Sequence, residues 1–426
     1  MTHDRLSGLQ PADLIYPWDS KQPADPRFVT FAEDPSIEIF EETIRDGCQN
    51  PSITMPSVAE RIELLGLMEG LGIHSVDYGL PVDGLDGANT VAISALLAEH
   101  VRAGWTHVPG LAIFQLAKHV DTVAALQDRH GIRLQGYGFL GSSRIRQQVE
   151  DWDLSRLVAQ VVDAQQSARV LNVDLPFVTE DTTGSHPGDL EVLFNAAIQN
   201  GCKRLVLCDT CGRVGPRGVR NLMAWVINFL ERNGYEDIEI DWHGHRDRGL
   251  ALANALMALE CGASRIHSCA LGVGERSGNL ETELLLANLA LMGFWERELT
   301  GLQTYCQTAS RILGVPITHS LPVIGGDAFK TGTGVHAAAI IKAAGNPELR
   351  DLVYSGVPAA LVGRDHEIVV TPMSGRSNVR FFASQLGLEV PSDEACAAVI
   401  SRAQQVGRML TDDEVRSALS EHPAQA

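Results

Sequence analysis

The chain lacks any apolar run long enough to cross a membrane. Hydrophobic residues make up 45% of its 426 residues, but polar residues interrupt every stretch before the roughly 18 that a spanning helix needs. The first residues, 1–8, also lack the apolar core of a secretory signal peptide. We therefore expect a soluble, cytoplasmic protein with no membrane partner.

Basic residues are scarce relative to acidic ones. The 34 Lys and Arg stand against 53 Asp and Glu, which gives a formal net charge of −19. A broad basic surface that binds nucleic acid is therefore excluded, and any anionic ligand must bind to arginines that lie in its own site.

A disulfide framework is lacking too, because the eight cysteines are scattered along the chain. Cys208 and Cys211 formally match a C-x-x-C pattern. No second pair of this kind accompanies them, so we interpret them as buried small hydrophobes rather than as a redox or zinc site.

Short β-rich runs alternate with amphipathic helical stretches after a proline-rich N-terminal arm, residues 1–35. The strands are expected at 37–44, 75–79, 106–111, 134–140, 170–175, 204–207, 238–242 and 265–270. The helices are expected at 58–71, 90–103, 114–129, 154–168, 190–200, 218–232, 250–261 and 281–292. This alternation predicts an α/β protein whose residues 36–300 form a (β/α)8 TIM barrel. Residues 301–426 are expected to form a smaller lid, linker and helical region, with helices at 392–406 and 411–419.

Three segments at strand ends carry candidate ligands for a divalent ion. His243 and His245 stand two residues apart at the end of a strand, so their side chains point the same way. Asp46 follows the first strand, and Asn279 ends a glycine-rich turn after the eighth. Strands 1, 7 and 8 are neighbours in a closed barrel, so nitrogen and oxygen ligands converge on its upper rim, without a thiolate.

The glycine-rich turn argues against a dinucleotide site. Ser277 stands where the third glycine of G-x-G-x-x-G belongs, and the turn follows the last strand rather than the first.

Several motifs together resemble the synthase branch of the metal-dependent TIM-barrel Claisen-condensing superfamily, which includes 2-isopropylmalate, homocitrate and citramalate synthases. They are TIRDGCQ at 43–49, VDYGLP at 76–81, DTCG at 209–212, HGHRDRG at 243–249, GVGERSGN at 272–279, GDAFKTGTGVH at 326–336 and MSGRSN at 373–378. The resemblance covers residues 36–415.

The resemblance implies an acyltransferase that joins acetyl-CoA to a 2-oxo acid. It implies Zn, Mn or Mg held by Asp46, His243, His245 and Asn279. Arg45, Glu180, His336 and Tyr354 are the implied catalytic residues, and Arg45, Gln49, Asp77, Tyr137 and Thr210 the expected substrate-binding ones. It also implies a homodimer in which His336 and Tyr354 complete the active site of the other subunit. The segment 322–378 has too few large apolar residues to form a core alone, which favours such an arrangement.

The residue types explain this chemistry. A 2-oxo acid can chelate a divalent ion through its keto and carboxylate oxygens, which prepares the keto carbon for attack. Arg45, next to Asp46, can neutralise the developing alkoxide. The nucleophile is the enolate of the acyl-CoA, formed when a base removes a methyl proton, and hydrolysis of the thioester then releases CoA.

Some positions depart from the family pattern and leave the acceptor open. Tyr137 stands where 2-isopropylmalate synthases tend to have histidine, and Val178 where they have serine. Thr183 or Gly184 replaces the arginine expected of homocitrate synthases. Arg144 and Arg146 are equally consistent with an anion site and with a solvated helix start. The amino-acid-binding regulatory domain of long 2-isopropylmalate synthases is not expected.

Three alternative functions remain. An acyl-CoA lyase is expected to carry cysteine in the turn after strand 8, where this chain has Glu275 and Arg276. A non-catalytic metal-binding barrel would have lost a ligand, and none is lost. A metal-dependent aldolase acting on free aldehydes is the third.

Overall fold

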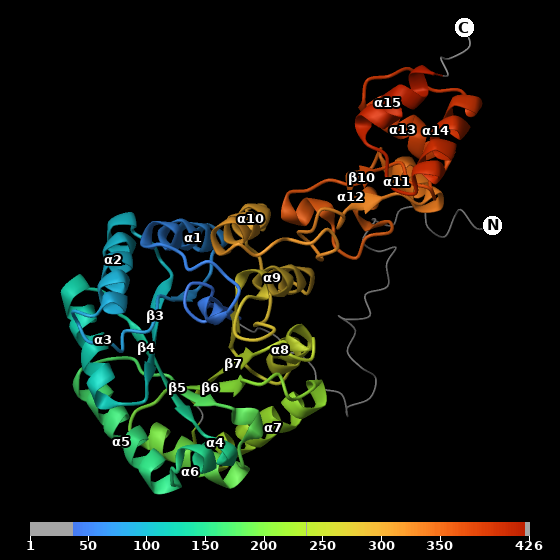
Figure 1. The fold of residues 1–426 in the computed structure, drawn as a ribbon. Helices are drawn as coiled ribbons and strands as arrows, with labels where there is room; N and C mark the ends of the chain where they lie inside the picture. The colour runs from blue at the N-terminus through green and yellow to red at the C-terminus, as the bar shows by residue number, and fades with distance from the viewer. Residues whose placement is uncertain (1–36, 236, 422–426) are drawn as a thin grey trace. The chain divides into compact units, whose positions relative to one another are not determined.

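The computed structural model describes residues 37–235 and 237–421, and its largest part is a closed barrel of eight parallel strands (Figure 1). The strands follow one another in chain order, and β1 closes the barrel by pairing with β8. They are β1 (Glu38–Glu41), β2 (Ser75–Asp77), β3 (Val108–Phe114), β4 (Gln135–Gly141), β5 (Phe177–Glu180), β6 (Arg204–Asp209), β7 (Glu239–Gly244) and β8 (Arg265–Ser268). The expected TIM barrel is confirmed, and the ends of β1, β7 and β8 are neighbours.

Helices form a ring around this barrel (Figure 1). They are α1 (Val58–Leu71), α2 (Ala88–Ala103), α3 (Ala117–His130), α4 (Arg144–Glu150), α5 (Leu154–Val170), α6 (Pro187–Gln199), α7 (Pro216–Arg232), α8 (Ala251–Glu260), α9 (Thr282–Leu291) and α10 (Leu302–Leu313). Short 3-10 turns lie at Gly47–Gln49, Thr182–Gly184 and Ala270–Gly272. Local sequence fixes the ends of α1, because Ser57 and Glu60 form a capping box and Gly72 ends the helix at a φ of 75°. In the described part of the chain, no helix is both long and apolar enough to span a membrane.

Charged side chains fill the end of the barrel at which the strands begin. Arg204 starts β6 and Arg265 starts β8, and both are buried. Both arginines form ion pairs with Asp241 and with Glu38. Arg265 also donates to the hydroxyl of Tyr137 on β4. Paired charges thus close the N-terminal end of the barrel, and the open space lies toward the C-terminal strand ends.

One strand prediction is wrong. The sequence predicts the fifth strand at 170–175, whereas α5 runs to Val170 and β5 begins at Phe177. Val173 and Leu175 alternate and are buried like strand residues, but they lie in the loop between α5 and β5. Asp174 makes one isolated bridge to Gln135 of β4, and continuous pairing of β5 with β4 begins at Phe177, opposite Gly138. The burial of alternate residues in this loop therefore produced an apolar pattern that is typical of a strand.

The residues after the barrel form a second compact unit. It contains Glu298–Gln303 and the chain from Ile317 onward, whereas Thr304–Pro316, most of α10, belongs with the barrel. Its elements are β9 (Lys330–Thr331), α11 (Gly334–Ala343), α12 (Pro347–Leu352), a 3-10 turn (Ala359–Val362), β10 (Glu367–Ile368), α13 (Arg376–Gln385), α14 (Asp393–Val406) and α15 (Asp412–Ser420). The expected mainly helical C-terminal region is confirmed. The N-terminal arm, residues 1–35, lies outside the described residues.

Two small cores hold this second unit together. One joins Ala337, Ile340 and Ile368, with Phe381 packed against it. Because Phe381 comes from α13, the segment 322–378 does not close this core alone. The other core lies among α13, α14 and α15, around buried residues such as Val399.

Candidate active site

A cavity of about 230 Å³ lies at the C-terminal ends of the barrel strands. Many of the residues that the sequence singles out line it: Arg45, Asp46, Gln49, Tyr137, Glu180, Thr210, His243 and His245. They come from different strands and from the loops that follow them. The position agrees with the rule that such barrels build their sites at the C-terminal strand ends.

Three of the expected metal ligands meet in this cavity. Asp46, His243 and His245 are buried, and one ligand atom of each lies within 4.8 Å of the others. His243 belongs to β7 and His245 follows it, while Asp46 follows β1. Two imidazoles and a carboxylate at this spacing can hold one divalent cation.

Asn279 lies beside these three residues. Its backbone bridges to His245, and its side-chain Nδ2 donates to Oδ2 of Asp46 at 2.7 Å. Its Oδ1 is buried and has no hydrogen-bond partner, and neither has Nδ1 of His245. Buried polar atoms normally find a partner. These unpaired atoms therefore fit a divalent cation, for which Asn279 would supply the oxygen ligand.

Glycines in the turn before Asn279 allow this arrangement. Gly274 has a φ of 150°, and a Cβ atom there would overlap the side-chain amide of Asn279. Gly278 has a φ of 100°, and a Cβ there would overlap the carbonyl of Gly272. The turn folds back on itself around the amide, which only residues without a side chain permit.

His245 can serve as a neutral ligand, and His243 has a ring nitrogen free for an ion. Burial, together with the neighbouring His243, lowers the pKa of His245 to about 4. His243 contacts Oε2 of Glu42 through Nδ1 at 2.8 Å. That contact leaves Nε2 of His243 available for an ion.

Arg45 is fixed by three carboxylates. Its Nε donates to Asp77 at 2.6 Å, Nη1 to Asp46 at 2.8 Å and Nη2 to Glu42 at 3.2 Å. Although burial opposes it, these acids raise the pKa of Arg45 above its already high value. A guanidinium has five N–H groups, so two of them remain for a ligand in the cavity that Arg45 lines.

Asp77 supports Arg45 and does not itself line the cavity. It is fully buried on β2, and burial raises its pKa to about 6, against the opposing charge of Arg45. Asp77 thus lies outside the cavity lining, and its contact with substrate stays a prediction.

Tyr137 lines the cavity with its ring. Its hydroxyl donates to Gln135 at 3.0 Å and accepts from Arg265, toward the barrel floor. The ring stacks on Phe40, with centroids 4.1 Å apart.

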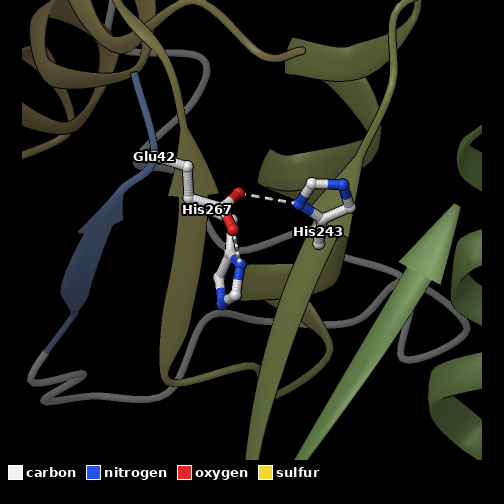
Figure 2. A group of neighbouring side chains, drawn as sticks. All are labelled: Glu42, His243 and His267. Atoms are coloured by element: carbon white, nitrogen blue, oxygen red, sulfur yellow. Dashed lines mark hydrogen bonds and ion pairs between the residues drawn. The ribbon is translucent and has the colours of Figure 1, made fainter. Parts of the chain in front are cut away.

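Sequence reasoning missed the roles of Glu42 and His267. Both are buried and line the cavity, and Glu42 lies between His243 and His267 (Figure 2). Burial alone would raise the pKa of Glu42, but His267 and His243 hold it well below its usual range. Burial likewise opposes protonation of His267, yet Glu42 and Asp241 raise its pKa to about 9. Side chains two residues apart on a strand share a face, and Arg265 on β8 points into the barrel. This alternation could have placed His267 in the barrel interior too.

Glu180 lies at the cavity wall, at the end of β5. Burial raises its pKa, although Arg146 opposes the shift from 3.4 Å away. Arg146 also pairs with Glu150, whereas Arg144 makes a two-pronged contact with Asp189. Arg144 therefore fits the solvated helix start, whereas Arg146 contacts Glu180 of the cavity wall without lining the cavity itself.

His336 and Tyr354 lie in the second unit. Their rings stack, with centroids 4.2 Å apart, and both side chains are exposed. Tyr354 has a φ of 59°, which is uncommon for a residue with a side chain.

The C-x-x-C pair does not act as a unit. Cys208 is buried in the cavity wall, whereas Cys211 is exposed, and neither forms a disulfide. Burial raises the pKa of Cys208 well above its usual range, which disfavours the thiolate that zinc binding needs. The interpretation as buried hydrophobes holds for Cys208 and is wrong for Cys211.

Comparison with known proteins identifies the family. The HMGL-like family profile matches residues 36–312, which is more than half of the chain. The chain belongs to the HMGL-like family. A probable 2-isopropylmalate synthase of Methanopyrus kandleri is 26% identical over 376 residues, covering 87% of this chain and 70% of that protein. The homocitrate synthase AksA of Methanothermobacter thermautotrophicus is 25% identical over 386 residues, covering 88% of this chain and 91% of that protein.

Solved structures show the same fold. The HMG-CoA lyase of Brucella melitensis superposes with a TM-score of 0.54 at 19% identity, covering 66% of this chain and 99% of that one. This likeness shows the fold alone. The family match, together with relatives named as synthases, confirms the resemblance to the synthase branch that the motifs indicate.

Proposed function

We propose that this HMGL-like protein is an acyltransferase that condenses acetyl-CoA with a 2-oxo acid to give a 2-substituted malate and CoA. The observation that carries the proposal is the meeting of Asp46, His243 and His245 in one cavity with Arg45. The relatives named 2-isopropylmalate synthase and homocitrate synthase support a condensing reaction. Our proposal is thus 2-isopropylmalate synthase-like in reaction type, with the acceptor to be determined.

Asp46, His243, His245 and Asn279 would hold the metal ion. A divalent ion held there would accept the keto and carboxylate oxygens of a 2-oxo acid as ligands and would supply polarisation of the keto group. Arg45 is held by its carboxylate neighbours at a fixed angle, so its remaining N–H groups can stabilise negative charge that develops on the keto oxygen. The Arg45 side chain is only 16% exposed, so its interaction with this charge is stronger than it would be in bulk water.

Proton transfers need a base near the methyl group of acetyl-CoA. Glu180 in the cavity wall is a candidate. Burial raises its pKa toward neutral pH, and a carboxylate with a raised pKa is a better proton acceptor. His336 and Tyr354 are candidates supplied by a second copy of the chain. Their exposed, stacked rings are consistent with a role at such an interface.

The cavity wall favours an acceptor with an apolar side chain. Ala112, Val178 and Val206 line it. Arg45 and His267 also line it, but each already faces carboxylates of the protein. Among the described residues of the lining, a second carboxylate on the acceptor would thus meet no unpaired cation. We therefore propose a 2-oxo monocarboxylic acid.

A CoA-release assay tests the proposal. The metal-loaded protein is given acetyl-CoA and a panel of 2-oxo acids with apolar, polar and acidic side chains. We expect CoA release that depends on an apolar 2-oxo acid and stops after chelation of the metal. The His243→Ala/His245→Ala protein should lose both metal and activity. No release with any 2-oxo acid would contradict the proposal.

An acyl-CoA lyase is the enzymatic alternative. The turn after β8 carries Glu275 and Arg276, and Arg276 is committed to Asp247 at 2.8 and 3.0 Å. Neither position offers a thiol for acid–base chemistry, and burial raises the pKa of Cys269, at the start of the turn, well above its usual range. Cleavage of a 3-hydroxyacyl-CoA to acetyl-CoA and a carbonyl compound, followed by separation of the CoA esters because no free CoA is released, would favour the lyase.

We also propose a homodimer with composite active sites. Mixing an inactive Asp46→Ala protein with an inactive His336→Ala protein should restore activity, because some mixed dimers contain one intact site. If subunits exchange and no activity returns, the site is built within one chain or His336 is not catalytic.

A further inference from the structure

Glu42 is the point at which three site residues meet. Its carboxylate accepts from Nδ1 of His243 at 2.8 Å and from Nη2 of Arg45 at 3.2 Å. Nδ1 of His267 lies 3.3 Å from Oε1 of the same carboxylate. Figure 2 shows the carboxylate between the two imidazoles. Glu42 is 2% exposed, so water does not replace these contacts.

His267 in turn holds Glu42. Its Nδ1 faces Glu42, and its Nε2 faces Oδ2 of Asp241 at 3.2 Å. Asp241 is itself paired with Arg204 and Arg265 on the barrel floor. An unbroken series of charged contacts therefore runs from the barrel floor through His267 and Glu42 to His243.

We propose that Glu42 is a positioning residue for the metal centre, and that His267 acts through it. Glu42 fixes the ring of His243 by accepting its Nδ1 proton, which leaves Nε2 as the ligand atom. A carboxylate behind a metal-binding histidine fixes its tautomer and orientation and makes it a stronger donor. The inference rests on the metal-binding part of the proposed function, and not on the identity of the substrate.

The same three residues could instead be taken for a second metal site. Glu42, His243 and His267 do lie within ligand-to-ligand distance of one another. However, Nε2 of His267 is already bonded to Asp241, and its Nδ1, although it makes no hydrogen bond to any described residue, lies 3.3 Å from Oε1 of Glu42 as an ion pair. By contrast, two further atoms without a partner in the described part of the chain, on Asn279 and His245, lie with Asp46 at the other group. The arrangement therefore favours a hydrogen-bonded support for the single metal centre.

Metal affinity of the full-length protein is the direct test. The metal-free protein is titrated with Mn²⁺ and, separately, with Zn²⁺ in competition with a chelator of known affinity. Glu42→Gln keeps the size of the side chain and removes its charge. We expect it to bind either ion 10- to 100-fold more weakly, which is the usual effect of losing such a partner.

Glu69→Gln is the matched control. Glu69 contacts Nδ1 of His107 at 2.8 Å, the same contact at the same distance, but neither residue lines the cavity. We expect unchanged metal affinity in this variant. Melting temperatures of the metal-free proteins show whether each variant folds. If Glu42→Gln does not fold, Glu42→Asp, which keeps the charge and withdraws the oxygens, should show the same loss.

The role of His267 is tested by combining variants. If His267 acts through Glu42, the single variant His267→Gln should bind metal more weakly than the wild type. The double variant should bind metal about as weakly as Glu42→Gln, because the effects of coupled residues do not sum. Additive losses would overturn the coupling. Unchanged affinity in Glu42→Gln would overturn the positioning role. Two ions per subunit, one of them lost in His267→Gln, would show a second metal site instead.

These outcomes are separate from the fate of the proposed reaction. Metal titration needs no substrate, so weaker binding by Glu42→Gln supports the inference even if no 2-oxo acid releases CoA. Conversely, a wild-type enzyme that condenses, together with a Glu42→Gln variant of full affinity, leaves the proposed function intact and contradicts the inference.

Discussion

At the scale of single residues, Arg45 is the side chain whose geometry matters most to the proposed reaction. Three carboxylates hold its planar guanidinium, each through a different nitrogen. A lysine in its place would keep the charge but could not bridge the same three partners. The angle of the remaining N–H groups would then no longer be fixed.

We therefore predict that Arg45→Lys retains metal and fold but loses most of its turnover. Loss of one donor to the transition state typically costs about 2.7 to 4 kcal/mol, or roughly a hundred- to a thousandfold in kcat. Steady-state kinetics with metal analysis of the same sample measures this. A variant with full metal content and wild-type kcat would remove Arg45 from the mechanism.

Single residues also mark how far the sequence predicts the site. The spacing of His243 and His245 places both on one side of a strand, which is local information. The contact between Glu42 and His267 joins the residue after β1 to β8, and only the closure of the barrel brings them together. Glu42 stands next to a recognisable motif, but nothing within its own segment reveals which distant residues it meets.

At the scale of elements, the turn between β8 and α9 carries the most constrained backbone of the site. Leu271 and Arg276 have positive φ values of 55° and 58°, besides the glycines. Glu41 and Glu283 hold the start of this turn by accepting from the backbone N–H groups of Ala270 and Leu271. Hydrogen bonds to buried carboxyl groups thus fix the start of the turn, and glycines allow further positive φ values in the rest of it.

Gly274→Ala should weaken metal binding, because the added Cβ would displace the side chain of Asn279. The matched control is Gly131→Ala, since Gly131 also has a positive φ, of 66°, but has open space around its Cβ position. We expect both variants to lose about 1 kcal/mol or more of stability, and only Gly274→Ala to lose metal affinity. Equal affinities in the two variants would show that Asn279 does not depend on this glycine.

Elements with strong local signals were well predicted from sequence. The capping box at Thr411 and Glu414 marks the start of α15, and the expected helix at 411–419 agrees with Asp412–Ser420. The prediction of the fifth strand failed because the burial of Val173 and Leu175 in a loop depends on tertiary packing. Apolar alternation alone cannot distinguish the two situations.

At the scale of the whole molecule, two buried carboxyl groups link folding to pH. Burial raises the pKa of Glu41 to about 7, although hydrogen bonds from Thr43 and Tyr305 oppose the shift. Burial likewise raises the pKa of Glu283 to about 7, against backbone hydrogen bonds. Tyr305 on α10 donates to Glu41 at 2.6 Å, so this helix is tied to the barrel.

The raised pKa values predict a loss of stability as pH increases. In the unfolded chain a glutamate releases its proton near its ordinary value of 4.5, whereas the folded protein keeps it until about pH 7. Between these values the folded state binds more protons, so the free energy of unfolding falls with increasing pH and levels off above 7. Each pKa unit corresponds to about 1.4 kcal/mol.

Glu283→Gln removes the ionisable group but keeps an oxygen for the N–H of Leu271. The difference in the free energy of unfolding between the variant and the wild type should therefore shift in favour of the variant between pH 5 and pH 8, by at most about 3 kcal/mol. Urea unfolding at a series of pH values measures the difference. A difference that does not change with pH would show that Glu283 ionises normally in the folded protein.

The formation of a carbon–carbon bond from the acetyl group is the central claim, and isotope labelling tests it most directly. The metal-loaded protein is incubated with acetyl-CoA carrying three methyl deuterium atoms and with an apolar 2-oxo acid, and the products are analysed by mass spectrometry. Condensation requires removal of one methyl hydrogen, so the account predicts a substituted malate that retains two deuterium atoms. Acetate that retains all three, with the 2-oxo acid unconsumed, would show thioester hydrolysis and contradict the account.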